Sequence, residues 1–151
     1  MKNIFIVLAL FLSGCASTDS VLVTTDTLLA TADTMRVIEQ AAEAAPYGVT
    51  GNFSFTIKAA AKPGEIVYLN TELDYRDRRC ITIALSPKVA SHIEQQYGVT
   101  AQEYYLGKKV QVNGTAKQVK IWFFERGIRT DKYYYQTHIR IIRPKQIEVL
   151  G

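Results

Sequence analysis

The chain has 151 residues, a formal net charge of +4 at pH 7 and 48% hydrophobic residues. This length supplies one hydrophobic core and excludes two full-sized domains. Two cysteines (Cys15 and Cys80) and two distant histidines (His92 and His138) lack the ligand spacing of a zinc site, so we expect no bound metal and no cofactor. The sequence holds no Gly-x-Ser-x-Gly, phosphate-loop or metalloprotease motif, and we predict no catalytic residue from it.

Residues 1–14 have the organisation of a secretory signal peptide. Lys2 precedes an apolar run at positions 4–12, which is too short for a membrane-spanning helix of roughly 20 residues. A basic start, a short apolar segment and small residues near the end are typical of a secretory signal. We therefore predict that the chain is exported. The small residues read Leu12-Ser13-Gly14-Cys15.

This four-residue segment resembles the lipobox of bacterial lipoproteins. The resemblance implies that the signal is removed before Cys15, and that Cys15 then carries acyl chains such as palmitate, which hold the protein on a membrane. Ala16 stands where an aspartate retains such proteins in the inner membrane. The resemblance therefore implies the outer membrane, with the protein facing the periplasm. The alternative is an ordinary signal peptide with a coincidental cysteine.

Residues 15–24 are expected to form a lipidated tether, followed by a helix or stalk at 25–46. Pro46 and Gly48 end this helix. Its apolar face is thin and leaves three roles open: packing on the domain, self-association, and spacing the domain from the membrane. The face is formed by apolar residues that recur at three- and four-residue steps, namely Leu28, Ala32, Met35, Ile38 and Ala42.

From residue 47 onward the apolar period changes to two, which predicts β-strands. After three strands, Ser86 and Pro87 are suited to begin a helix and Gly98 to end it. The three strands and a short helical turn are expected at 49–58, 66–69, 80–85 and 100–105.

The C-terminal part predicts a long β-hairpin and a short edge strand. After a strand at 108–116 the apolar residues change phase, for which we expect a β-bulge near Lys117 or Gln118. A polar turn is expected at 125–132. The remaining strands are predicted at 119–124, 133–142 and 147–150.

This order of strands and helix resembles that of the OB-fold. The segments 67–77, 107–115 and 145–149 are also similar to a repeated signature of exported bacterial OB-like domains, a largely uncharacterised group. The resemblance implies a mainly β protein. Residues 47–151 would form a small OB-fold-like Greek-key barrel with one helix between strands 3 and 4, preceded by an N-terminal helix. The chain departs from the group in its longer, more aromatic hairpin.

Aromatic and basic residues gather in this hairpin, where strand alternation puts Lys120, Trp122 and Phe124 on one face. Such a face suits an envelope protein or an anionic polymer. It also suits single-stranded nucleic acid, where each stacked base contributes roughly 1–3 kcal/mol. The remaining alternative is cross-strand packing of the aromatic rings. The candidate ligand-binding residues are Lys120, Trp122, Phe124, Tyr133, Tyr135 and Arg140.

The polar segment before the third strand carries oxygen ligands at every second or third position, as calcium loops do. Arginines lie among its acids and the glycine of an EF-hand loop is absent, so internal salt bridges are predicted instead. Cys80 follows this segment and is interpreted as a small buried strand residue, the alternatives being a reactive thiol or an intermolecular disulfide. The acidic and amide residues of the segment are Asn70, Glu72, Asp74 and Asp77.

These observations favour a membrane-anchored, non-enzymatic binding or accessory module of the cell envelope, which contacts a protein or an anionic polymer. A second hypothesis is a single-stranded nucleic-acid-binding protein, for example in DNA uptake. A third is an enzyme of unknown type, which would require the fold to gather His138 with acidic partners in a cleft.

Overall fold

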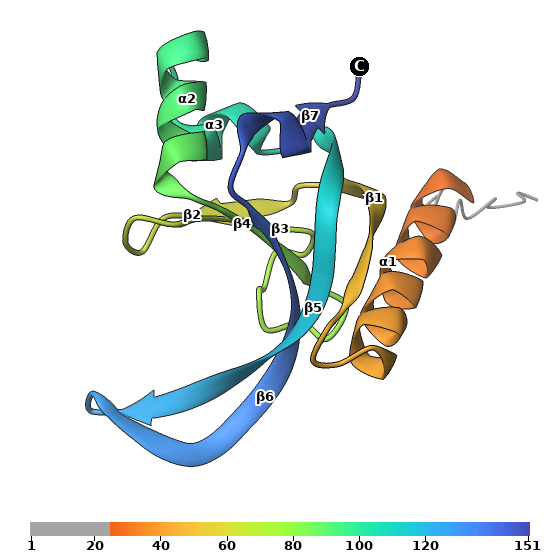
Figure 1. The fold of residues 1–151 in the computed structure, drawn as a ribbon, viewed down its shortest axis with the longest axis vertical. Coiled ribbons are helices and arrows are strands. Elements are labelled where there is room, and N and C mark those ends of the chain that lie inside the picture. The colour runs from red at the N-terminus through yellow and green to blue at the C-terminus, as the bar shows by residue number, and fades with distance from the viewer. Residues whose placement is uncertain (1–24) are drawn as a thin grey trace, which may run out of the picture.

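The computed structural model describes the backbone of residues 25–151 and the side chains of residues 33–151. The predicted signal peptide at 1–14, the predicted lipid attachment at Cys15 and the tether at 15–24 lie outside the described residues. The described chain is mainly β, with one N-terminal helix leading into a seven-stranded sheet that curls into a half-barrel (Figure 1). The mainly β class and the N-terminal helix are therefore confirmed.

In chain order the elements are α1 (Thr25–Glu43), β1 (Val49–Thr56), β2 (Ala59–Ala61), β3 (Val67–Asn70), β4 (Ile81–Leu85), α2 (Pro87–Tyr97), α3 (Ala101–Tyr105), β5 (Lys109–Glu125), β6 (Ile128–Ile141), the 3-10 turn η1 (Pro144–Gln146) and β7 (Ile147–Val149).

Helix α1 packs against the sheet, mainly on β1 and β5 (Figure 1). Val37 and Ala41 are buried in the hydrophobic core from this helix. Of the three roles that the sequence left open for the helix, the structure places it in contact with the domain. Gly48, between α1 and β1, has a positive φ of +79°, and a Cβ there would lie 2.3 Å from the carbonyl oxygen of Ala116. A glycine is required at this close approach.

The sheet order is β1-β5-β6-β4-β3-β2, with β7 added to β5. The β4–β6 pair is parallel and all other pairs are antiparallel. β1 and β2 lie at opposite ends of this order, yet only residues 57 and 58 separate them in the chain. Ile57 donates its backbone N–H to Lys108, and Lys58 donates to Asn70, both at 2.9 Å. This continuous run therefore joins both ends of the sheet and curls it.

The sequence did not predict β2. Its three residues are alanines, which have low strand propensity and no alternating pattern. Pairing with β3 holds this segment in the sheet, with Ala60 opposite Leu69. The predicted edge strand at the C-terminus is confirmed, since β7 pairs with β5 through Val149 and Val110.

Helices α2 and α3 lie between β4 and β5 and cover one end of the half-barrel (Figure 1). Gly98 ends α2 in the left-handed conformation, with φ of +72°. Thr100 and Glu103 form a capping box that begins α3. The buried residues of these helices belong to the same core cluster as the strands: Val89, Ala90, Ile93, Ala101 and Tyr105.

The bulge predicted near Lys117 or Gln118 is wrong, because β5 runs unbroken through these residues and its register shifts only between Trp122 and Phe124. The apolar phase changes for another reason. Up to Ala116 the apolar side chains face the core, whereas beyond it the strand leaves the barrel, and Val119 lies on the opposite, outer face.

The predicted turn at 125–132 is too long. Arg126 and Gly127, with φ of +52° and +81°, make the turn, and β6 begins at Ile128. Polar residues that indicated a loop, such as Asp131 and Lys132, lie in an exposed two-stranded ribbon, where neither face needs to be apolar.

Candidate functional site

The outer halves of β5 and β6 form a two-stranded ribbon that projects from the half-barrel (Figure 1). We call residues 118–136 the arm. Trp122 is opposite Tyr133 and Lys120 is opposite Tyr135, so that their side chains share one face. Alternate residues of the two strands point to the other face. The arm therefore presents two distinct surfaces.

The first surface, the stacked face, is formed by Lys120, Trp122, Arg129, Tyr133 and Tyr135. The Lys120 Nζ lies 4.3 Å from the centroid of the Tyr133 ring, 5.3 Å from that of Trp122 and 5.8 Å from that of Tyr135. The Arg129 guanidinium lies 4.7 Å from the Trp122 ring. Trp122 and Tyr133 meet edge to face at 5.3 Å. Two cations are thus held against a row of aromatic rings.

The stacked face is open to solvent, because Tyr133 and Tyr135 are 47% and 49% exposed. Within residues 33–151 no ion pair involves Lys120 or Arg129. The rings pack on one another, as the packing hypothesis predicted, yet about half of each tyrosine stays available. The stacked face therefore combines preorganised rings with two cations that form no ion pair in the described residues.

The structure brings four of the six candidate residues, Lys120, Trp122, Tyr133 and Tyr135, into ring and cation contacts on the stacked face. Phe124 is opposite Arg129 and so shares this face nearer the tip, where it is exposed and outside these contacts. Arg140 lies elsewhere, because its even position on β6 directs it away from the face of Tyr133 and Tyr135. Arg129 was not among the predicted site residues, because residues 125–132 were interpreted as a turn. Residues in a turn are not assigned to either face of a strand.

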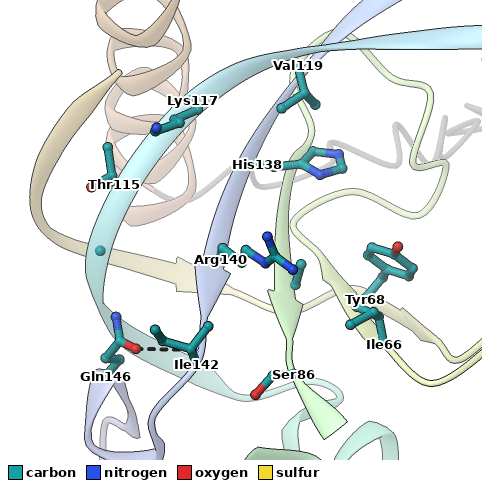
Figure 2. Close-up of a pocket in the computed structure, with 12 residues that line it drawn as sticks. Ile66, Tyr68, Ser86, Thr115, Lys117, Val119, His138, Arg140, Ile142 and Gln146 are labelled. Carbon is teal, nitrogen blue, oxygen red and sulfur yellow. Dashed lines mark hydrogen bonds between the residues drawn. The ribbon is translucent and has the colours of Figure 1, made fainter. Parts of the chain in front are cut away.

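The second surface crosses β3, β4, β6 and β5 and contains two hollows; we call it the groove face. Figure 2 shows the first hollow, of about 600 Å³, with Arg140 near its centre and Lys117 and His138 beside it. Its other lining residues are Ile66, Tyr68, Ala84, Ser86, Gly114, Thr115, Val119, Ile142 and Gln146.

The second hollow, of about 670 Å³, adjoins the first, and Tyr68 and His138 line both. The centroids of these two rings are 6.4 Å apart. Polar side chains from β3, β4 and β6 line this second hollow together with tyrosine rings. Its lining includes Asn70, Tyr75, Thr82, Ile121, Tyr134 and Gln136.

His138 is the only histidine beside these hollows among the described residues, and burial lowers its pKa from the ordinary value of 6.5. Its Nε2 lies 2.9 Å from the Gln136 Oε1, and the Gln136 amide donates in turn to the carbonyl oxygen of Tyr75. No aspartate or glutamate is among the residues that line either hollow. The acidic partner that the enzyme hypothesis requires beside His138 is therefore not found in this part of the chain.

The polar segment after β3 is a set of ion pairs, as predicted. Asp74 contacts Arg76 at 3.2 Å and Asp77 contacts Arg79 at 2.7 Å. Hydrogen bonds from Arg79 lower the pKa of Asp77 to about 2. Among the described residues, no group of three or more His, Cys, Asp or Glu side chains is arranged to hold a metal ion.

Cys80 is buried, as interpreted, but it lies directly before β4 rather than within a strand. Burial raises the pKa of its thiol. A buried thiol with a raised pKa is a poor nucleophile, because the thiolate is the reactive form.

Comparison with known proteins assigns no family: no protein-family model matches the chain, and no curated protein matches it significantly. Among the helices that the structure describes, none is both long and apolar enough to cross a membrane.

Proposed function

We propose that this protein is a non-enzymatic binding module of the bacterial cell envelope, and that its stacked face contacts an anionic polymer. A lipid on Cys15 would hold it on the outer membrane, facing the periplasm. The observation that carries the proposal is the pair of cations, Lys120 and Arg129, held against half-exposed aromatic rings without a carboxylate partner in the described chain. Aromatic rings stack on planar or ring-shaped ligand groups, while the cations neutralise acidic groups.

An OB-like barrel is part of this proposal. Three features support it: the parallel β4–β6 pair, the helices between β4 and β5, and the run from β1 to β2 that joins both ends of the sheet. In that assignment β5 and β6 are the last two barrel strands, and the arm is their extended connection. Loops at this position contribute to ligand binding in OB-folds.

In Figure 1 the arm ends at the lower left of the molecule and α1 begins at its right, so the stacked face is not adjacent to the start of α1. A periplasm-facing polymer that carries sugar rings and acidic groups matches both the rings and the charge of the stacked face.

Trp122, the only tryptophan of the chain, reports on this face. We would titrate the full chain, held in phospholipid nanodiscs, with polygalacturonate and follow tryptophan emission at low and high salt. We expect a saturable change that weakens at high salt, because the contact is partly ionic. Lys120→Gln should weaken binding about tenfold, whereas Lys88→Gln, an equal loss of charge on an exposed site of α2, should leave it within about twofold.

A single-stranded oligonucleotide and free anionic vesicles, titrated in the same way, test the alternatives. A response to the oligonucleotide alone would support the nucleic-acid hypothesis and contradict the polymer. A response to vesicles alone would contradict the polymer and indicate that the stacked face binds a lipid surface. If none of the three probes changes the emission, the aromatic rings serve to stabilise the arm and the proposal is wrong.

A further inference from the structure

We propose that the first hollow of the groove face is a second binding site, and that it takes a small amphipathic carboxylate. The apolar part of this ligand would lie on the sheet and its carboxylate would pair with Arg140. The site lies on the opposite face of the sheet from the stacked face, and only the nanodisc format of its test rests on the lipid proposed for Cys15.

The register of the sheet creates this hollow. Tyr68 is opposite Ala84, and Ala84 is opposite Arg140, so three strands place one small residue between two long ones. Because the alanine side chain is a single methyl group, the sheet is locally hollow between the Tyr68 ring and the Arg140 guanidinium (Figure 2). A volume of about 600 Å³ falls within the range of sites for small molecules.

The walls of the hollow are mostly apolar. Ile66 borders it from the β3 side, Val119 from β5, and Ile142 from the end of β6 (Figure 2). A ligand with an aliphatic or aromatic group would remove these side chains and the Tyr68 ring from water. That gain favours an amphipathic ligand over a bare inorganic anion.

The charges of the hollow select an acid. Arg140 and Lys117 line it, no acidic residue does, and neither cation forms an ion pair within the described chain. A guanidinium matches a carboxylate with two parallel hydrogen bonds, which a lysine does not. Arg140 is therefore the residue expected to hold the carboxylate, with Lys117 adding positive potential.

A buried hydroxyl adds an independent observation. Ser86 lines the same hollow, and its Oγ is buried without a hydrogen-bond partner in the part of the chain that the structure describes. A buried polar atom without a partner is unfavourable unless a ligand or water satisfies it. A carboxylate oxygen supplies an acceptor of the kind that this hydroxyl lacks.

The test compares three probes that differ in charge and share one ring: phenylacetate, phenylacetamide and phenethylammonium. The full chain in phospholipid nanodiscs is titrated with each, and binding is followed by saturation-transfer NMR of the probe, with empty nanodiscs as the blank. We expect saturable binding of phenylacetate, at least tenfold weaker binding of phenylacetamide, and none of phenethylammonium.

Two substitutions separate charge from shape. Arg140→Gln should weaken phenylacetate binding at least tenfold while leaving the thermal unfolding midpoint nearly unchanged, because Arg140 is exposed. Ala84→Leu fills the hollow without removing a charge and should abolish binding. Lys88→Gln, on α2, is the matched control and should bind phenylacetate as the unaltered chain does.

The proposal is overturned if phenylacetate gives no signal above empty nanodiscs, or if phenylacetamide binds equally well. It is also overturned if Arg140→Gln folds and still binds with unchanged affinity. These outcomes are separate from those of the polymer titration, because the probes and variants concern different faces of the sheet.

Discussion

The inner and outer halves of the β5–β6 hairpin differ in how strongly packing against neighbouring strands constrains their side chains. The inner half of β5 pairs with β1, β6 and β7, and its alternate side chains are buried in the barrel. The outer half pairs only with β6 and is open on both faces. In the barrel each position is constrained by packing, whereas in the arm a side chain can be retained for what it binds. The candidate site on the stacked face therefore lies where packing constrains the side chains least.

The largest expected contrast between the two halves is in stability. Ile139 is fully buried in the barrel part of β6, and Tyr133 is 47% exposed in the arm. Ile139→Ala should lower the free energy of unfolding by about 2–5 kcal/mol, because it removes buried methyl groups and leaves a cavity. Tyr133→Ala should cost about 1 kcal/mol or less. Urea unfolding measures both, and equal losses would mean that the arm is part of the cooperative core.

A second contrast concerns two glycines with positive φ. Gly48 (φ +79°) faces the carbonyl oxygen of Ala116, whereas Gly127 (φ +81°) has no atom within 4 Å of an added Cβ. Gly127→Ala should cost about 1–2 kcal/mol, from the left-handed backbone alone. Gly48→Ala should cost more, because the backbone of α1 or β5 must also shift. Thermal unfolding of the two variants would contradict this account if Gly127→Ala were the more damaging.

The smallest expected effect lies at the junction of the two halves, where His138 pairs with Lys117. Burial lowers the pKa of His138 in the folded state, and the groups around it (Lys117, Arg140 and Tyr68) include no carboxylate. Well above pH 6.5 the imidazole is neutral in both states. As pH falls below 6.5, the unfolded chain takes up this proton first, so the free energy of unfolding decreases until the folded imidazole is also protonated.

His138→Asn should remove this contribution and flatten the fall in stability that begins as pH decreases through 6.5. Urea unfolding at several pH values compares the variant with the unaltered chain. Identical profiles would show that His138 does not control this dependence, and that the junction tolerates a charged imidazole.

Much of the fold was predictable because its signals are local. Alternation located β1, β3 and β4, while Gly98 marked the end of α2 and a helical turn was expected at 100–105, where α3 forms. The exceptions also have local causes. β2 is three alanines without a pattern, and the phase change near Lys117 indicated a bulge where the strand in fact leaves the barrel.

The stacked face was largely predictable for the same reason, since side chains two positions apart on one strand share a face. Sequence alone determined that Lys120 and Trp122 lie together and that the hairpin is aromatic and basic. The groove face could not be read in this way. Tyr68, Ala84 and Arg140 come from three strands, and only the order and register of the sheet make them neighbours. A hollow depends on which side chains lie across from one another, and that is decided by tertiary pairing rather than by any local pattern.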